Sequence, residues 1–219
     1  MTENGQSQEP GALELSVIVP ARNEERSLGE CLASLLRQSE PGFALGAQWE
    51  VIVVDDDSTD ATRKIAAEAA EGHAGVTVMD APPLDVSSHG GFTGKTNACW
   101  AGAQRARGGH LLFTDADTVH EMGDLSRALR EAERHKAALL SYSPRQIVNG
   151  FWQRAVMPLI FSELASVYPM QQVNDPGRRL AAANGQCILV ERDAYFSVGG
   201  HRAVGKTVLE DVALAHNIK

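Results

Sequence analysis

From residue 15 to residue 143, short apolar runs alternate with stretches whose apolar residues recur at helical spacing. The runs are rich in valine, isoleucine and leucine, which is typical of buried strands, and they lie at 15–20, 49–54, 76–79, 111–114 and 137–143. The amphipathic stretches predict helices at 28–36, 60–71, 95–106 and 124–135. This alternation predicts an α/β fold with a doubly wound, mainly parallel sheet and helices on both faces.

Local signals indicate where two of these helices begin and end. Ser27 and Glu30 have the spacing of a capping box, which predicts a helix start at this point. Thr59 or Asp60 can cap the next helix, and Gly72 can end it.

Glycine and proline mark further turns in the chain. The stretch 81–94 is rich in proline, serine and glycine, so it predicts a loop. Residues 183–190 predict a strand interrupted at Gly185, where a ligand can approach the backbone closely. Residues 199–201, Gly-Gly-His, predict a tight turn.

Three of the predicted strands run directly into polar loops, at 22–24, 55–57 and 115–117. Because the carboxyl ends of parallel strands meet at one edge of a sheet, we expect these three loops to lie together. Ligands of open α/β sheets bind just outside that edge. The pattern therefore predicts a binding site there without reference to any known motif.

The third of these loops carries two acids one residue apart, Asp115 and Asp117. Two neighbouring carboxylates repel each other unless a cation lies between them, and a hard divalent cation with oxygen ligands is the usual partner. The alternative is an acidic turn that caps the following helix, because this spacing of acids is common.

A segment of different character follows at 147–170, where large apolar residues crowd together with few charges. It predicts a helix in the core or over the sheet. The alternative is a peripheral contact with a membrane surface through one face of this segment.

Composition narrows the class of protein. The chain has 219 residues, of which 43% are hydrophobic and 22% charged, as expected for one globular domain. The net charge of −8 argues against general binding to nucleic acid. Cys31, Cys99 and Cys187 have neither metal nor disulfide spacing, which favours a reducing compartment.

The two ends of the chain differ from the rest. Residues 1–14 are polar and lack the apolar core of a signal peptide, so we expect a disordered leader there, followed by the domain at 15–219. Residues 209–219 predict a helix without a C-terminal cap, so we expect the natural domain to be truncated here.

Glycine spacing argues against two common nucleotide-binding loops. Residues 90–94 lack the pattern of a dinucleotide-binding loop. Gly94, Lys95 and Thr96 match the end of a P-loop, but His89 stands where that loop requires its first glycine.

Five short motifs nevertheless occur in an order that resembles the family 2 inverting glycosyltransferases. They are 17–24 (Val-Ile-Val-Pro-Ala-Arg-Asn-Glu), 53–62 (Val-Val-Asp-Asp-Asp-Ser-Thr-Asp-Ala-Thr), 94–97 (Gly-Lys-Thr-Asn), 115–117 (Asp-Ala-Asp) and 210–211 (Glu-Asp). The resemblance covers nearly all of the chain after the leader. It implies the GT-A fold, a Rossmann-like, mainly parallel sheet flanked by helices on both faces.

The resemblance also implies a nucleotide-sugar donor, for which we expect a UDP-sugar. The family's donor-binding positions carry over to Pro20, Ala21, Arg22, Glu24, Asp55, Asp56, Lys95, Asn97, Asp115 and Ala116. Asp55 and Asp56 would lie near the base and ribose, and Lys95 would meet the phosphates or the sugar. For the acids at 55–57 a plain helix N-cap remains the alternative, and for Lys95 a solvated lysine.

The expected cofactor and general base follow from the same resemblance. Asp115 and Asp117 would hold Mg²⁺ or Mn²⁺ on the diphosphate, which neutralises the leaving group. Asp211 would be the general base for the acceptor hydroxyl, with Glu210 beside it. The alternative for Asp211 and Glu210 is a pair of acids in the first turn of a helix.

A closer resemblance points to the bacterial hopanoid-associated glycosyltransferases and related carotenoid glycosyltransferases. It rests on 114–120, on 173–179 and on 185–194. It implies a lipid-linked acceptor, with a glycan as the alternative, and a cytoplasmic enzyme at the inner face of the bacterial plasma membrane. The Gln-x-x-Arg-Trp motif of processive members is not found in the chain, and processivity stays open.

Two other functions compete with this interpretation. A sugar nucleotidyltransferase shares a related sheet and a metal-binding acid pair, but it needs a glycine-rich basic loop after the first strand, which Ala21-Arg22-Asn23-Glu24 does not resemble. A non-catalytic nucleotide-sugar-binding module is the other, although the presence of Asp115, Asp117 and Asp211 argues against it.

Overall fold

The computed structural model describes residues 13–38, 40–84, 93–147 and 150–219. The predicted leader, 1–14, lies outside the described residues except for its last two positions. Most of the predicted loop at 81–94 also lies outside them.

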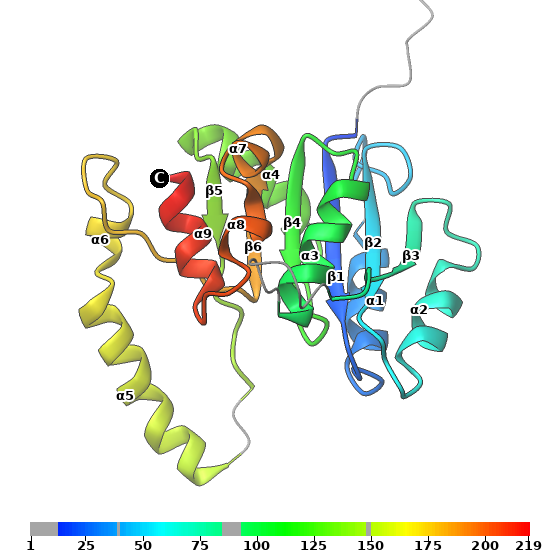
Figure 1. The fold of residues 1–219 in the computed structure, drawn as a ribbon, viewed down its shortest axis with the longest axis horizontal. Coiled ribbons are helices and arrows are strands. Elements are labelled where there is room, and N and C mark those ends of the chain that lie inside the picture. Colours follow the sequence, from blue (N-terminus) through cyan, green and yellow to red (C-terminus); the bar gives the residue numbers. More distant parts are fainter. Residues whose placement is uncertain (1–12, 39, 85–92, 148–149) are drawn as a thin grey trace, which may run out of the picture.

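A six-stranded sheet forms the centre of the molecule, with the strand order β3-β2-β1-β4-β6-β5 (Figure 1). Neighbours among the first four strands in this order pair in parallel, whereas β6 is antiparallel to both β4 and β5. The prediction of a mainly parallel α/β sheet is therefore confirmed. The strands are β1 (Leu15–Ala21), β2 (Trp49–Asp55), β3 (Val76–Asp80), β4 (His110–Thr114), β5 (Leu139–Ser141) and β6 (Cys187–Glu191).

Helices cover both faces of the sheet and enclose two hydrophobic clusters. One cluster packs the sheet against α1 (Leu28–Leu36), α2 (Thr62–Ala70) and α4 (Asp124–His135). The other packs it against α3 (Gly94–Arg105), α7 (Arg192–Ser197), α8 (Gly200–Val204) and α9 (Glu210–Ile218). Alternate residues of β1 enter opposite clusters, as the two-residue period of a strand requires.

Two local predictions were wrong. The Ser27 side chain does not cap α1, because its hydroxyl donates to the Glu24 carboxylate at 2.6 Å instead. The strand predicted at 183–190 begins only at Cys187. Asn184 accepts a hydrogen bond from the Gln186 N–H at 3.0 Å, and this local turn replaces strand pairing just before β6.

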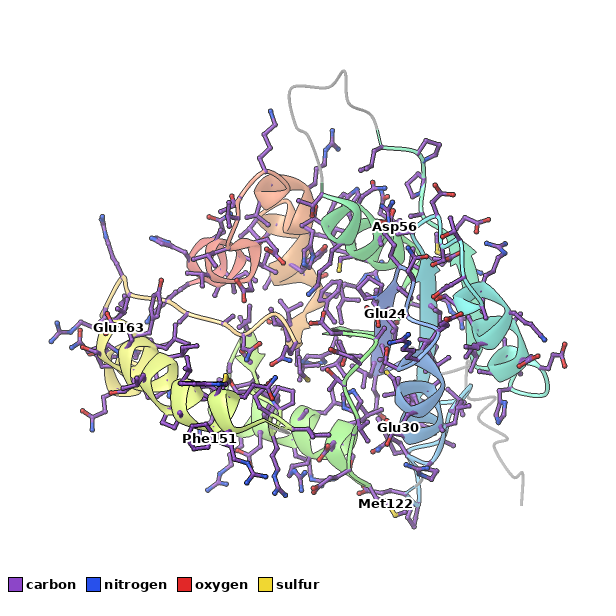
Figure 2. All side chains as sticks on the ribbon, turned by 90° about the horizontal axis from the view of Figure 1, so that it is seen from below. Glu24, Glu30, Asp56, Met122, Phe151 and Glu163 are labelled. Atoms are coloured by element: carbon purple, nitrogen blue, oxygen red, sulfur yellow. The ribbon has the colours of Figure 1, made fainter. Side chains whose placement is uncertain are left out.

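The apolar segment predicted at 147–170 forms α5 (Phe151–Val167), followed by α6 (Met170–Val173). The core interpretation of this segment was wrong, because no residue of α5 is buried. Figure 1 shows α5 extending away from the sheet, and Figure 2 shows its side chains projecting on all sides. Within the described ranges, no helix combines the length and the apolar character needed to cross a membrane.

A buried polar network ties β1 and β2 to the segment that enters β4. The Ser16 hydroxyl donates to Glu50 at 2.8 Å, and the Gly108 N–H donates to Ser16. Arg107 donates to Glu50 through its backbone and its guanidinium group. Burial raises the pKa of the Glu50 carboxyl, but the hydrogen bonds from Arg107 and Ser16 outweigh this effect and lower the pKa.

This network predicts an acid-sensitive contribution to stability. Since folding lowers the pKa of Glu50, its contribution is complete above the carboxyl pKa of the unfolded chain and is lost as the pH falls through the folded value. We expect Glu50→Gln to lower the free energy of unfolding by about 2 kcal/mol at neutral pH, with a smaller difference in acid. Urea denaturation across the pH range measures both effects. The exposed Glu68→Gln is the control, and equal stability of the two variants would contradict the prediction.

Candidate active site

The loops after β1, β2 and β4 meet at one edge of the sheet, as predicted. Ala21 pairs with Asp55 at the ends of β1 and β2, and Ile18 pairs with Phe113 near the end of β4. Figure 2 views the molecule from below the orientation of Figure 1 and labels Glu24 and Asp56 on these loops.

The loops after β1 and β2 hold each other through reciprocal hydrogen bonds. The Asn23 N–H donates to Ser58 at 3.1 Å, and the Thr59 N–H donates back to the Asn23 side chain at 2.9 Å. The Glu24 N–H donates to the Thr62 hydroxyl at 2.7 Å. Asn23 takes a φ of 56°, a left-handed conformation that asparagine tolerates better than most residues. These hydrogen bonds therefore fix the two loops relative to each other.

A cleft of about 340 Å³ opens between these loops and the loop after β4. It brings together eight of the ten predicted donor-binding residues and both predicted metal ligands. Its lining consists of Pro20, Ala21, Arg22, Glu24, Asp56, Gly94, Lys95, Asp115, Ala116 and Asp117.

Asp56 lines the cleft and contacts the β1 loop. Its backbone N–H donates to the Ala21 carbonyl at 2.9 Å, and its carboxylate pairs with Arg22 at 3.2 Å. Gly94 lies against this carboxylate, since a Cβ added there would stand 2.0 Å from Asp56 Oδ2. Glycine thus allows the first turn of α3 to approach the acid closely.

Lys95 joins α3 to the acid pair. Thr93 and Thr96 form a capping box at the start of α3, which fixes the turn that carries Lys95. The Lys95 ammonium lies 2.5 Å from Asp115 Oδ1. Burial lowers the pKa of Lys95, but the Asp115 carboxylate outweighs this effect and raises the pKa above its ordinary value. Lys95 is therefore a cation at neutral pH.

The donor set of the β4 loop fits a hard divalent cation that has other ligands as well. Asp115 and Asp117 both line the cleft and supply carboxylate oxygens. Among the described residues, no group of three or more His, Cys, Asp or Glu side chains is arranged to hold a metal. A cation here would therefore take further oxygens from a ligand or from water, as Mg²⁺ does at phosphate sites.

A buried histidine that sequence reasoning missed anchors the same loop. His120 is fixed through its ring and its backbone. The ring Nε2 lies 3.0 Å from the Thr114 hydroxyl, and the backbone N–H donates to the Ser34 hydroxyl at 3.0 Å. Burial lowers the pKa of His120 and so favours the neutral ring. Loop residues 115–119 are thus tied to buried groups on either side.

Glu210 and Asp211 lie at a second, smaller cavity of about 10 Å³. The Asp211 carboxylate accepts the Gly185 N–H at 2.8 Å and the Val212 N–H at 2.8 Å, which fixes its orientation. Lys95 and Asp115 line this cavity as well as the cleft, so the two spaces adjoin. His201 also lines it, and the sequence marked this histidine only as part of a tight turn.

Two predicted donor-binding residues do not line either space. Asp55 is buried and faces Arg63, whose guanidinium lies 3.5 Å from its carboxylate. The Asn97 side chain donates to the Pro82 carbonyl at 2.7 Å, so it supports the chain before the 85–92 segment. The structure therefore gives both residues contacts within the protein.

Known proteins similar to this chain support the family resemblance. A family model described as "Glycosyl transferase family 2" matches residues 16–197. The 4,4'-diaponeurosporenoate glycosyltransferase of Staphylococcus aureus (strain USA300) is 30% identical over 207 residues, which cover 91% of this chain and 50% of that protein. This relative matches the resemblance to carotenoid-type lipid glycosyltransferases.

Solved structures similar to this one show the same fold. A mannosyltransferase from Pyrobaculum calidifontis in complex with GDP-Man and Mn²⁺ has a TM-score of 0.66 and 22% identity, covering 95% of this chain and 52% of that one. TarS 1-349 of S. aureus in complex with UDP has a TM-score of 0.58 and 20% identity, covering 93% and 54%. Both likenesses concern the fold alone, which is the GT-A fold predicted from the motifs.

The chain spans about half the length of the curated relatives that it matches. Within that span, the matched family model includes the β1 loop, the Asp56 loop, Lys95 and the acid pair of β4. The order of these motifs, their meeting at one sheet edge and the family match lead to one conclusion. The chain belongs to glycosyl transferase family 2.

Proposed function

We propose that this chain carries the donor-binding and catalytic domain, residues 15–219, of an inverting glycosyltransferase. It transfers a sugar from a UDP-sugar to a hydroxyl group of a lipid-linked acceptor. One observation carries the proposal, which is that Asp56, Lys95, Asp115 and Asp117 line one cleft while Glu210 and Asp211 lie at the adjoining cavity.

The cleft offers separate surroundings for the two parts of a nucleoside diphosphate. The Asp56 carboxylate can accept hydrogen bonds from a base N–H or a ribose hydroxyl. The Lys95 ammonium supplies positive charge for the phosphates. Solved structures of similar fold contain UDP, UDP-GlcNAc or GDP-Man, which supports a nucleotide-sugar donor.

Asp115 and Asp117 would hold Mg²⁺ or Mn²⁺ together with the diphosphate oxygens. When bound, such a cation neutralises charge that develops on the leaving diphosphate. Lys95 pairs with Asp115 in the structure, and the same ammonium can turn to a phosphate oxygen when a ligand enters. Similar structures that contain Mn²⁺ support this proposal.

Asp211 would take the proton of the acceptor hydroxyl during an inverting transfer. Its two carboxylate oxygens already accept backbone N–H groups, so the side chain is held in place before substrate arrives. Glu210 stands next to it in the first turn of α9 and lines the same cavity. A nucleotidyltransferase would release pyrophosphate, whereas the proposed enzyme releases UDP, so the released product distinguishes the two.

The lipid acceptor and a membrane contact are supported by α5. Its side chains are exposed on all sides, including Trp152 at 77% and Leu159 at 70%, and the helix carries only Arg154 and Glu163 as charged residues. Exposed amphipathic aromatic residues favour a membrane interface. The S. aureus relative is named for a diaponeurosporenoate acceptor. We therefore expect the enzyme at the inner face of the bacterial plasma membrane.

The acid pair predicts metal-dependent nucleotide binding. Since Asp117 would supply a metal oxygen, Asp117→Asn should weaken the Mn²⁺-dependent part of UDP binding by about 10- to 100-fold and leave the fold intact. Calorimetric titration of UDP with and without Mn²⁺ measures this. Asp193→Asn, an exposed acid outside the cleft, is the matched control. Tight UDP binding by the wild-type protein in EDTA would contradict the metal role.

The proposed base predicts a loss of transfer without a loss of binding. Asp211→Asn keeps an oxygen for the Gly185 N–H but removes the basic group, so transfer should slow by about 10²- to 10⁴-fold. Glu210→Gln should have a milder effect. Single-turnover transfer at saturating donor and Mn²⁺ gives the rates, and UDP titration verifies binding. Near-normal transfer by Asp211→Asn would refute this role.

The exposed helix predicts binding to lipid vesicles. Trp152→Glu removes one large apolar side chain, so we expect about tenfold weaker sedimentation with phosphatidylglycerol vesicles. Met122→Glu makes the same change at an exposed apolar residue that Figure 2 shows apart from α5, and it should bind as the wild type does. Wild-type protein that stays in the supernatant with vesicles would exclude the membrane contact.

A further inference from the structure

His201 is a buried histidine to which neither the family motifs nor the proposed transfer assigns a role. It is 4% exposed in α8, and its ring packs edge-on against Phe113 with the ring centroids 4.6 Å apart. Phe113 belongs to β4, immediately before the loop that carries the acid pair. The histidine therefore lies directly behind the candidate active site.

A tight glycine turn holds His201 in this position. Gly199 and Gly200 have φ values of 79° and 49°, which glycine adopts without a steric penalty. A Cβ on Gly200 would stand 2.3 Å from Cζ of Tyr195, so only glycine allows this approach. The turn brings both the backbone and the ring of His201 to the Tyr195 hydroxyl.

The hydrogen bonds at Tyr195 assign the proton of the neutral histidine ring. The Tyr195 oxygen accepts the His201 backbone N–H at 3.1 Å and lies 2.9 Å from Nδ1. We assign the buried Tyr195 hydroxyl proton to its hydrogen bond with Nδ1, which places the proton of the neutral ring on Nε2. Burial, reinforced by the positive charge of Lys95, lowers the pKa of His201 to about 3, so the ring is neutral at physiological pH.

The Nε2–H group has no hydrogen-bond partner among the described residues. His201 lines the small cavity together with Lys95, Asp115, Glu210 and Asp211. The volume of about 10 Å³ suits one water-sized group, so it can admit a hydroxyl group but not a sugar ring. Because Lys95 and Asp115 also line the cleft, this cavity lies next to the expected position of the diphosphate.

We propose that the small cavity is a hydroxyl subsite for the transferred sugar, in which His201 Nε2–H donates a hydrogen bond to one sugar hydroxyl oxygen. This inference rests on the proposed function, since the sugar is bonded to the diphosphate in the cleft. The Glu210 carboxylate of the cavity can accept a hydrogen bond from the same hydroxyl, which leaves Asp211 for the acceptor. His201 thus selects donor sugars that carry a hydroxyl at this position.

The test compares binding of a sugar nucleotide with binding of its nucleotide alone. UDP-glucose, UDP-GlcNAc and GDP-mannose are titrated with Mn²⁺, and the sugar nucleotide that the wild type binds is used with its parent nucleotide. His201→Phe keeps a planar ring but removes the donor, so it should weaken sugar-nucleotide binding by about tenfold and leave UDP or GDP binding unchanged. His201→Gln, which retains an N–H donor, should recover part of the loss.

Three further measurements separate this role from a structural one. The unfolding temperature of His201→Phe should match that of the wild type to within a few degrees. Tyr195→Phe should weaken sugar-nucleotide binding less than His201→Phe does, because it frees the ring proton of His201 to move to Nδ1. In a series of deoxy-sugar donors, one analogue should bind the wild type and His201→Phe equally.

Different results overturn different claims. Equal weakening of nucleotide and sugar-nucleotide binding, or an effect confined to the acceptor, would refute the subsite while the proposed function stands. A wild-type protein that binds none of the three sugar nucleotides would refute both.

Discussion

The parallel register of β1 with its two neighbours is the constraint on which the candidate site depends. β1 pairs with β2 on one side and with β4 on the other, so three strand ends reach the same edge. Asp56 and Asp115 are far apart in the chain, yet they line one cleft because of this pairing. A shift of one residue in either pairing would turn the core residues of that strand to the opposite face, which the two hydrophobic clusters oppose.

The concentration of acids at this edge requires positive charge nearby. Asp56, Asp115 and Asp117 line the cleft in a chain whose net charge is already −8. Arg22 pairs with the first of these acids and Lys95 with the second. Both cations also line the cleft, so an anionic ligand can compete for them while a metal ion takes over the acids. On the proposed function, binding of donor and metal would replace these ion pairs with contacts to the ligands.

Hydrogen bonds to neighbouring elements fix the loops that carry these acids. His120 and the reciprocal hydrogen bonds of Asn23 fix the loops that carry the acids. On the other side, the turn at 199–201 presses Gly200 onto Tyr195 and orients the neutral ring of His201. By contrast, α5 has no buried residue, so its apolar surface is free for a partner that the sheet does not provide. The proposed sugar-transfer chemistry and the proposed membrane contact therefore use separate parts of the molecule.

The order of strands and helices and the polar loops at the strand ends could be predicted from the sequence, because periodicity and turn residues act locally. The sequence also indicated most of the acids that line the cleft, since acids after a buried parallel strand lie at the carboxyl edge of the sheet, although Asp55 at the end of β2 pairs with Arg63 instead. The departure of α5 from the core is visible in the fold alone, because a helix that is apolar on every side carries no local record of what covers it. The same holds for Asn97, which bonds to Pro82, and for His201, whose proton is assigned by Tyr195. Those partners come from the packing of other elements, and no spacing within the chain encodes them.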